Sequence, residues 1–174
     1  MAGRIESKLA EMGLEVPDLN PPAAAYVPYV RSGSLLFVSG QVPVGPDGLV
    51  TGQLTEVDND GGPEFDRAVG AAKLCALNLM AAVKHATGDL DLVRQVVKLT
   101  GFVNGTNTFT QHPKIVNGCS ELLGEAFGPA GQHARSAIGS SCLPFNVMVE
   151  VEGIFEINRM QENADRISGA LGDD

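Results

Sequence analysis

A single arginine interrupts a run of small and apolar residues in the last third of the chain. The run spans 134–139 and contains Arg135, and the apolar segment 147–157 that follows it carries Glu150 and Glu152. A planar guanidinium binds a carboxylate through two parallel charge-assisted hydrogen bonds, and a glutamate can orient and deprotonate a water molecule. The pattern therefore indicates a polar pocket for a small carboxylate. The alternative is an ion pair between Arg135 and one of the glutamates at the protein surface.

Period-two alternation along a strand decides which residues share a face with these charged groups. Arg135 lies on the same face as Ala137 and Gly139. In 147–157, the valines at odd-numbered positions take one face and the glutamates take the other. The charged groups therefore require two strands that hold them at fixed positions in a sheet.

Other classes of catalytic motif are absent from the sequence. His85, His112 and His133 have no second metal ligand at helical spacing, and neither HExxH nor a Cys/His cluster occurs. The loop 45–48 matches no nucleotide-binding pattern, and no GxSxG nucleophile elbow is present. We therefore expect neither a metal nor a cofactor.

Hydrophobic periodicity predicts three helices and six strands, one of them very short. The helices are expected over 3–12, 64–87 and 109–127, where apolar residues recur every three or four positions. The strands are expected over 26–31, 35–39, 92–103, 134–140 and 147–157, with a short one at 49–51. The first two should form a hairpin around Gly33, and Pro28 favours an edge position for the first.

Two long helices and a mixed sheet define an α+β domain in which the helices cover one face of the sheet. No predicted element covers the other face, which we expect to be apolar. Large exposed apolar patches are rare on monomers. The element order therefore predicts an oligomer.

The composition fits one globular domain and disfavours polyanionic partners. The 174 residues are 44% hydrophobic, and 21 acidic against 12 basic residues give a net charge of −9. Nucleic acids and anionic membranes attract Lys/Arg clusters, so neither is expected as a partner. Three cysteines without a CxxC motif, a charged N-terminus and the lack of a membrane-length apolar run indicate reduced thiols and a cytoplasmic location.

Four short blocks, taken in their order and spacing, resemble the reactive intermediate deaminase (RidA or YjgF) family. They are Val-Ser-Gly-Gln-Val-Pro at 38–43, Val-Val-Lys-Leu-Thr-Gly-Phe-Val at 96–103, Ala-Arg-Ser at 134–136, and Leu-Pro at 143–144 followed by 147–153. The resemblance divides the chain into an N-terminal helix with a proline-rich lead-in (1–23), a RidA-like domain (24–158) and a polar tail (159–174). The longer loops and the added N-terminal helix resemble a longer subgroup of the family.

The resemblance implies a chorismate-mutase-like α+β fold of the Bacillus type and a homotrimer with three clefts between neighbouring subunits. It also implies hydrolysis of enamines or 2-imino acids to 2-oxo acids and ammonia. Arg135 aligns with the family arginine that binds the substrate carboxylate, and Glu150 aligns with the glutamate that positions water. The same alignment sets Ser39, Gly40 and Ala137 beside the substrate, the last two through backbone N–H groups.

Some positions depart from the family pattern. Ala137 stands where the archetype has a cysteine, so any role of that thiol is lost. The family tyrosine aligns with Tyr29 by its Pro-Tyr context or with Tyr26 by its distance to Ser39, and a helix asparagine aligns with Asn117. Without the resemblance, the tyrosine would be interpreted as an aromatic residue at the edge of the core and Asn117 as a solvated polar residue on a helix.

Two other functions compete with the deaminase. A trimer that only binds a small carboxylate or oxo acid needs Arg135 but has no use for Glu150 as a water-orienting group. A ribonuclease would need a basic surface with aromatic platforms, which the acidic composition disfavours.

Overall fold

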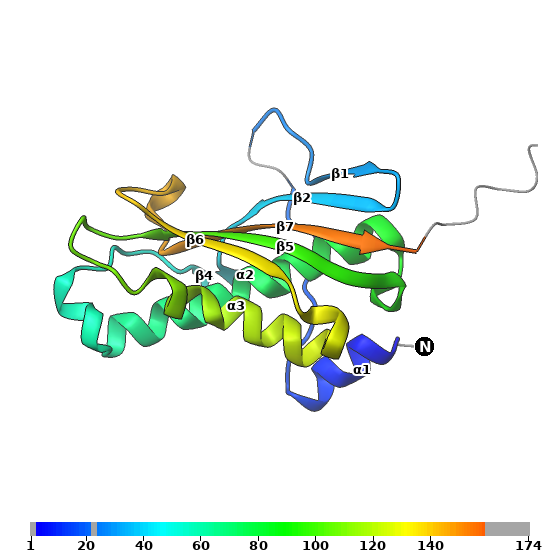
Figure 1. Ribbon diagram of the computed structural model, residues 1–174, viewed down its shortest axis with the longest axis horizontal. Helices are drawn as coiled ribbons and strands as arrows, with labels where there is room; N and C mark the ends of the chain where they lie inside the picture. Colours follow the sequence, from blue (N-terminus) through cyan, green and yellow to red (C-terminus); the bar gives the residue numbers. More distant parts are fainter. Residues whose placement is uncertain (1–2, 22–23, 159–174) are drawn as a thin grey trace, which may run out of the picture.

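The computed structural model describes residues 3–21 and 24–158, and these form a five-stranded sheet with two long helices on one face (Figure 1). The helices are α1 (Arg4–Glu11), α2 (Pro63–Thr87) and α3 (His112–Phe127). The strands are β1 (Tyr29–Ser32), β2 (Leu35–Gln41), β3 (Val44–Gly45), β4 (Gly48–Leu49), β5 (Val93–Asn104), β6 (Ala134–Ser140) and β7 (Val149–Ile157). Four short 3-10 helices are η1 (Glu56–Asp60), η2 (Leu90–Leu92), η3 (Gly128–Gly131) and η4 (Pro144–Asn146).

The main sheet is mixed and has the strand order β1-β2-β7-β5-β6. Only β5 and β6 pair in parallel, which is possible because α3 makes the crossover between them. The strands β1 and β6 lie at the two edges. The α+β layout with helices on one face is therefore confirmed, and so is the edge position that Pro28 favoured for the first strand.

The largest differences from the sequence prediction concern three places in the chain. The first strand begins at Tyr29 instead of position 26, and β3 pairs with β4 in a small hairpin that the prediction reduced to one strand at 49–51. The helix expected from 109 begins at His112. Residues 108–110 stay outside it because Asn59 hydrogen-bonds their backbone while Phe109 inserts into the core.

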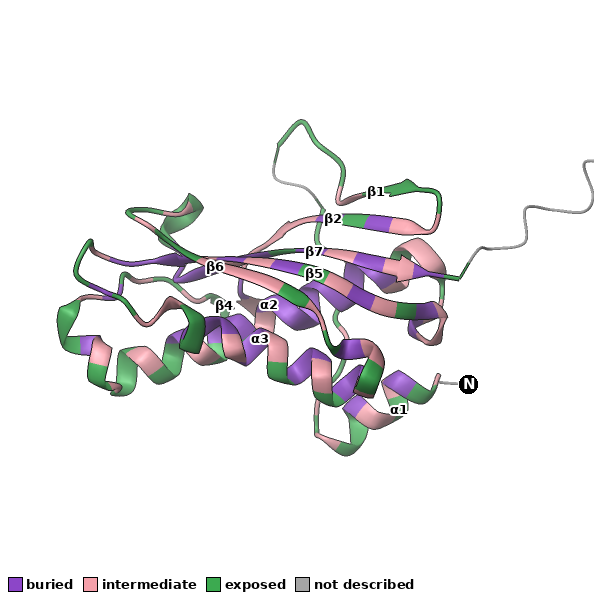
Figure 2. Cartoon of the chain, viewed as in Figure 1, coloured by how far each residue is buried: buried purple, intermediate pink, exposed green. Residues whose placement is uncertain are grey.

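The core lies between the sheet and the helices α2 and α3. The helix α2 is bounded by Pro63 in its first turn and by Gly88, which adopts the left-handed conformation that ends many helices. Its buried stripe packs against β7 and β2, while α3 packs against α2, β5 and β6. Figure 2 shows burial concentrated in α2 and the central strands, while β1 and β6 are mostly exposed or half-buried.

The N-terminal helix is an integral part of this core. Ile5 and Leu9 are buried in the main hydrophobic cluster. The Asp91 carboxylate, in η2, accepts hydrogen bonds from the backbone N–H groups of Arg4 (2.7 Å) and Ile5 (3.0 Å). A carboxylate at that position satisfies two unpaired donors of the helix and complements its dipole. The N-terminal helix therefore shares one hydrophobic core with the rest of the described chain.

The sheet face opposite the helices has a mixed character instead of the apolar one expected. Phe37 and Ile138 are exposed on it, at 42% and 49% of their surface. Lys98, Thr100 and Glu152 line the same shallow hollow as Phe37, with a volume of about 230 Å³. Polar groups therefore occupy the middle of a face that the sequence pattern predicted to be hydrophobic.

Candidate functional site

Arg135 lies on the edge strand β6 and turns its side chain toward α3. Strand pairing places it next to Leu99 of β5, which is buried under the helices. The Nη1 group donates hydrogen bonds to Asn117 Oδ1 and Ser120 Oγ, both at 2.9 Å, and Nη2 donates one to the carbonyl of Pro113 at 3.2 Å. About two turns of α3 thus hold the guanidinium in a fixed plane.

These partners are all electrically neutral. No carboxylate within the described ranges lies at ion-pair distance from Arg135, so the surface ion pair considered from the sequence is wrong for this part of the chain. Three of the five guanidinium protons point at Asn117, Ser120 and Pro113, which leaves the Nε–H and one Nη2–H without a partner among the described residues. An Nε–H and an Nη2–H on the same side of a guanidinium are the pair of donors that binds a carboxylate in bidentate fashion.

A buried thiol lies behind the guanidinium. Burial raises the pKa of Cys119 to about 12, and the charge of Arg135 opposes this only in part. The thiolate is the reactive form of cysteine, so Cys119 is inert at neutral pH. Cys119 therefore does not replace the cysteine that the family resemblance implies at position 137. This chain has Ala137 there, half-buried on the helix-facing side of β6 together with Arg135.

Glu150 lies on the other face of the sheet. It is half-buried on β7 opposite Phe102, and burial together with the nearby charge of Glu152 raises the pKa of its carboxyl group. A raised pKa makes the ionised carboxylate a stronger base than an exposed glutamate. Its environment therefore suits a group that takes a proton from water.

A glycine makes room for this carboxylate. Strand β2 is irregular between Val38 and Gln41, where its pairing with β7 shifts register. A Cβ atom at position 40 would overlap the Glu150 carboxylate where it now lies, so a side chain at Gly40 would displace that carboxylate. Ser39, the residue before Gly40, ties β2 to the loop before β1, since its Oγ donates a hydrogen bond to the carbonyl of Val27 at 2.7 Å.

The predicted site residues therefore form two groups. Arg135 and Glu150 pair with positions 99 and 102 of β5, which are three residues apart and so face opposite sides of the sheet. Asn117 and Ala137 belong with Arg135, while Ser39 and Gly40 belong with Glu150. A single chain does not bring the arginine and the glutamate into one cleft.

Neither candidate tyrosine contacts these two groups through a hydrogen bond of the described residues. The hydroxyl of Tyr29 lies 2.8 Å from Nδ1 of His85, near the C-terminal end of α2. Tyr26 is half-exposed in the loop before β1. The assignment of the family tyrosine to one or the other stays a prediction.

Two residues at this site, Ser120 and His133, were not predicted from the sequence. Ser120 accepts a hydrogen bond from Arg135, and Nε2 of His133 lies 2.9 Å from the same Ser120 oxygen. Asn117 and Ser120 are three residues apart on α3, a spacing that places side chains on one face of a helix. That spacing was available in the sequence, but it did not reveal which strand the face meets.

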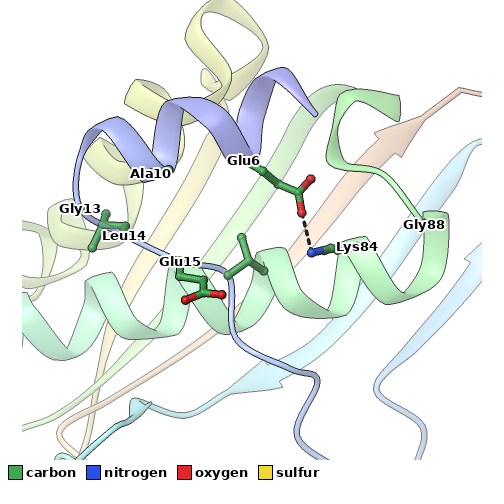
Figure 3. A pocket seen from close by; sticks show the side chains of 8 residues that line it. Glu6, Ala10, Gly13, Leu14, Glu15, Lys84 and Gly88 are labelled. Atoms are coloured by element: carbon green, nitrogen blue, oxygen red, sulfur yellow. Dashed lines mark ion pairs between the residues drawn. The ribbon is translucent and has the colours of Figure 1, made fainter. Parts of the chain in front are cut away.

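A hollow in the described part of the chain lies elsewhere, between α1 and α2 (Figure 3). Its volume is about 730 Å³, and an ion pair between Glu6 and Lys84 borders it. None of the predicted site residues lines it. Among the described residues no cluster of three His, Cys, Asp or Glu side chains is arranged to hold a metal, and no helix has the length and apolarity to cross a membrane.

Comparison with protein families identifies one match over most of the chain. A sequence model described as YjgF/chorismate mutase-like, putative endoribonuclease matches residues 6–157. The match begins inside α1, earlier than the resemblance seen from the sequence blocks. It includes all seven strands and the three α-helices apart from the start of α1.

Individual relatives agree with this match. Protein TCP17 of Trypanosoma cruzi is 41% identical over 161 residues, which cover 90% of this chain and 96% of that protein. The crystal structure of Atu1372 from Agrobacterium tumefaciens, described as of unknown function, is 41% identical with a TM-score of 0.79 and covers 89% of this chain and 94% of the other. A putative endoribonuclease from Shewanella oneidensis MR-1 is 32% identical with a TM-score of 0.81, covering 89% and 100%.

Proposed function

Because this chain belongs to the YjgF/chorismate-mutase-like family, we propose that it hydrolyses reactive enamines and 2-imino acids to 2-oxo acids and ammonia. The observation that carries the proposal is the state of Arg135. Its guanidinium is held by three neutral acceptors, while its bidentate edge has no partner among the described residues. A positive group fixed in this way is suited to the carboxylate of an imino or oxo acid.

The proposed hydrolysis requires one water molecule and one base. The substrate carboxylate binds the Nε–H and Nη2–H of Arg135, which fixes the adjacent C=N carbon. Glu150 takes a proton from water as the oxygen attacks that carbon, and the C=N electron pair moves to nitrogen. Nitrogen takes the proton held by Glu150, which returns the base to its ionised form. The tetrahedral intermediate then collapses: its hydroxyl proton passes to nitrogen, the C=O double bond forms, and the C–N bond breaks to release ammonia. The sum consumes one imine and one water and yields one oxo acid and one ammonia.

The two halves of the site come from different subunits in this proposal. Arg135 is at a sheet edge and faces the helices, while Glu150 is on the opposite face of its own chain. A cleft that holds both forms when β6 of one subunit lies against the open face of its neighbour. Three such contacts close a ring, as in the homotrimer implied by the family resemblance.

Subunit mixing tests the shared site directly. Arg135→Ala and Glu150→Gln chains are each expected to be inactive. When the two are unfolded, mixed in equal amounts and refolded, about a quarter of the clefts should combine an intact arginine with an intact glutamate. Imine hydrolysis is followed on the product of an amino-acid oxidase, and each variant refolded alone is the control. If mixing restores nothing while wild type is active, the shared cleft of Arg135 and Glu150 is wrong.

Two further measurements bound the proposal. Light scattering should give three times the 18.2 kDa of one chain, and a monomer at micromolar concentration would contradict the shared cleft. Wild type that binds 2-oxobutanoate in calorimetry but never accelerates imine hydrolysis would favour the second candidate, a trimer that only binds oxo acids. The observation that favours this second candidate is Ala137, which stands where the family archetype has a cysteine.

A further inference from the structure

A chain of hydrogen bonds extends behind Arg135, away from its bidentate edge. Nη1 of Arg135 donates to Ser120 Oγ at 2.9 Å. That oxygen lies 2.9 Å from Nε2 of His133, whose Nδ1 lies 2.6 Å from the carbonyl oxygen of Gly131. The three side chains come from β6, α3 and the segment just before β6, and all are half-buried.

The direction of each hydrogen bond follows from the last acceptor in this series, the carbonyl of Gly131. The Gly131 carbonyl can only accept, so Nδ1 of His133 carries the proton. In the neutral ring Nε2 is then an acceptor, and the Ser120 hydroxyl donates to it. This leaves a lone pair of Ser120 Oγ for the Nη1–H of Arg135. Each group in the chain is satisfied in this single arrangement.

Without the imidazole, the serine hydroxyl has another choice. A serine inside a helix readily donates to the carbonyl four residues before it, which here is Val116. Such a rotation redirects the oxygen lone pairs away from the guanidinium. Arg135 would then keep only Asn117 and the Pro113 carbonyl as acceptors. The histidine therefore decides whether Ser120 faces Arg135 as an acceptor.

We propose that His133 and Ser120 are positioning residues that fix the plane of the Arg135 guanidinium for binding a carboxylate. This inference rests on the function proposed above, and it assigns to the pair no contact with the substrate. Ser120 lies between Arg135 and His133 in this arrangement, and the proposal gives it no part in the chemical step. The prediction is a change in affinity for carboxylates without a comparable change in the chemical step.

The first experiment separates affinity from turnover. Ser120→Ala and His133→Ala should each raise the Kd for 2-oxobutanoate by roughly 3- to 10-fold, the range expected for losing one ordinary hydrogen bond, since neither residue contacts the ligand itself. The turnover rate at saturating imine should stay within about twofold. Ser120→Thr and His133→Gln keep the donor and the acceptor and should restore most of the affinity. Gln132→Ala, an exposed neighbour in the same segment, is the matched control.

The double variant provides the sharpest test. Since both residues act through one hydrogen bond to Arg135, Ser120→Ala combined with His133→Ala should bind no more weakly than either single variant. Multiplied single effects would overturn the proposal. A loss of turnover in Ser120→Ala with unchanged Kd would also overturn it, because the serine would then take part in the chemistry.

A measurement without ligand keeps this inference separate from the proposed function. Nitrogen NMR of wild type should show His133 as the neutral Nδ1–H form, and the Nε–H of Arg135 should exchange with water faster in Ser120→Ala than in wild type. If wild type neither binds oxo acids nor hydrolyses imines, the proposed function fails. If the Nδ1–H form is absent, or if exchange at Arg135 is the same in both proteins, the positioning role fails, whatever the activity.

Discussion

Two cations on this molecule, Arg135 and Lys84, are held in opposite ways. Lys84 lies at the hollow between α1 and α2 and forms an ion pair with Glu6 at 2.5 Å. Arg135 lies between β6 and α3 and donates to an amide, a hydroxyl and a carbonyl. The hollow beside Lys84 is the larger feature of the surface, yet its cation already has a carboxylate.

The difference separates a cation whose charge is already paired from one that the proposed function leaves free for a ligand. A cation that faces an anion of its own chain gains modest stability and loses its capacity to bind another anion. A cation held by neutral dipoles is oriented while its charge remains uncompensated. In a chain with a net charge of −9, such a group is where the proposed function places the carboxylate of a small ligand.

The largest expected effect comes from changing the uncompensated cation. Arg135→Ala removes the bidentate pair with the substrate, and this loss in a desolvated cleft costs on the order of 2–5 kcal/mol. The value of kcat/KM for imine hydrolysis should then fall roughly 30-fold to several thousand-fold. Arg135→Lys should also be poor, because an ammonium group does not reproduce the planar fork. Activity within twofold of wild type for the alanine variant would place the site elsewhere.

The second effect separates binding from chemistry at the other half of the site. Glu150→Gln removes the base and should lower turnover by about 100-fold or more, while the Kd for 2-oxobutanoate changes little. Coupled oxidase assays and calorimetry measure the two quantities. Equal losses of turnover and binding would mean that Glu150 contacts the ligand instead of water.

Thermal unfolding controls for damage to the fold in this variant. Burial raises the pKa of Glu150, so its protonated form stabilises the folded state below the unfolded pKa, and that contribution is lost as the pH rises through the folded pKa. The neutral glutamine should therefore give a Tm at pH 7 at least equal to that of wild type. The difference should vanish in acid, where Glu150 itself is neutral.

The smallest effect is expected at Lys84, whose charge is paired with Glu6. Lys84→Met should cost up to about 1 kcal/mol of unfolding free energy, since the pair is partly exposed, and should leave imine hydrolysis unchanged. The ion pair lowers the pKa of Glu6 and raises that of Lys84. Its contribution is therefore lost as the pH falls through the Glu6 pKa and again as it rises through the Lys84 pKa. Urea unfolding between these limits, with Glu6→Gln as the matched variant, measures it.

The sequence by itself determined the elements and the faces within each strand. The buried stripe of α2 and the alternation in β7 repeat with the geometric periods of a helix and a strand, and these periods are local properties of the chain. The same alternation grouped Arg135 with Ala137, as found. Boundaries were less secure where a distant residue intervenes, as Asn59 does before α3.

Only the tertiary structure decided which groups meet across elements. The sequence left Arg135 with a choice between a ligand and a glutamate of its own chain, because alternation fixes the faces of each strand but not how two strands are oriented relative to each other. The strand order sets Arg135 and Glu150 on opposite faces and turns Asn117 and Ser120 toward the guanidinium. These contacts join residues 15 or more positions apart, and their distances depend on how the helices pack on the sheet, which no local period encodes.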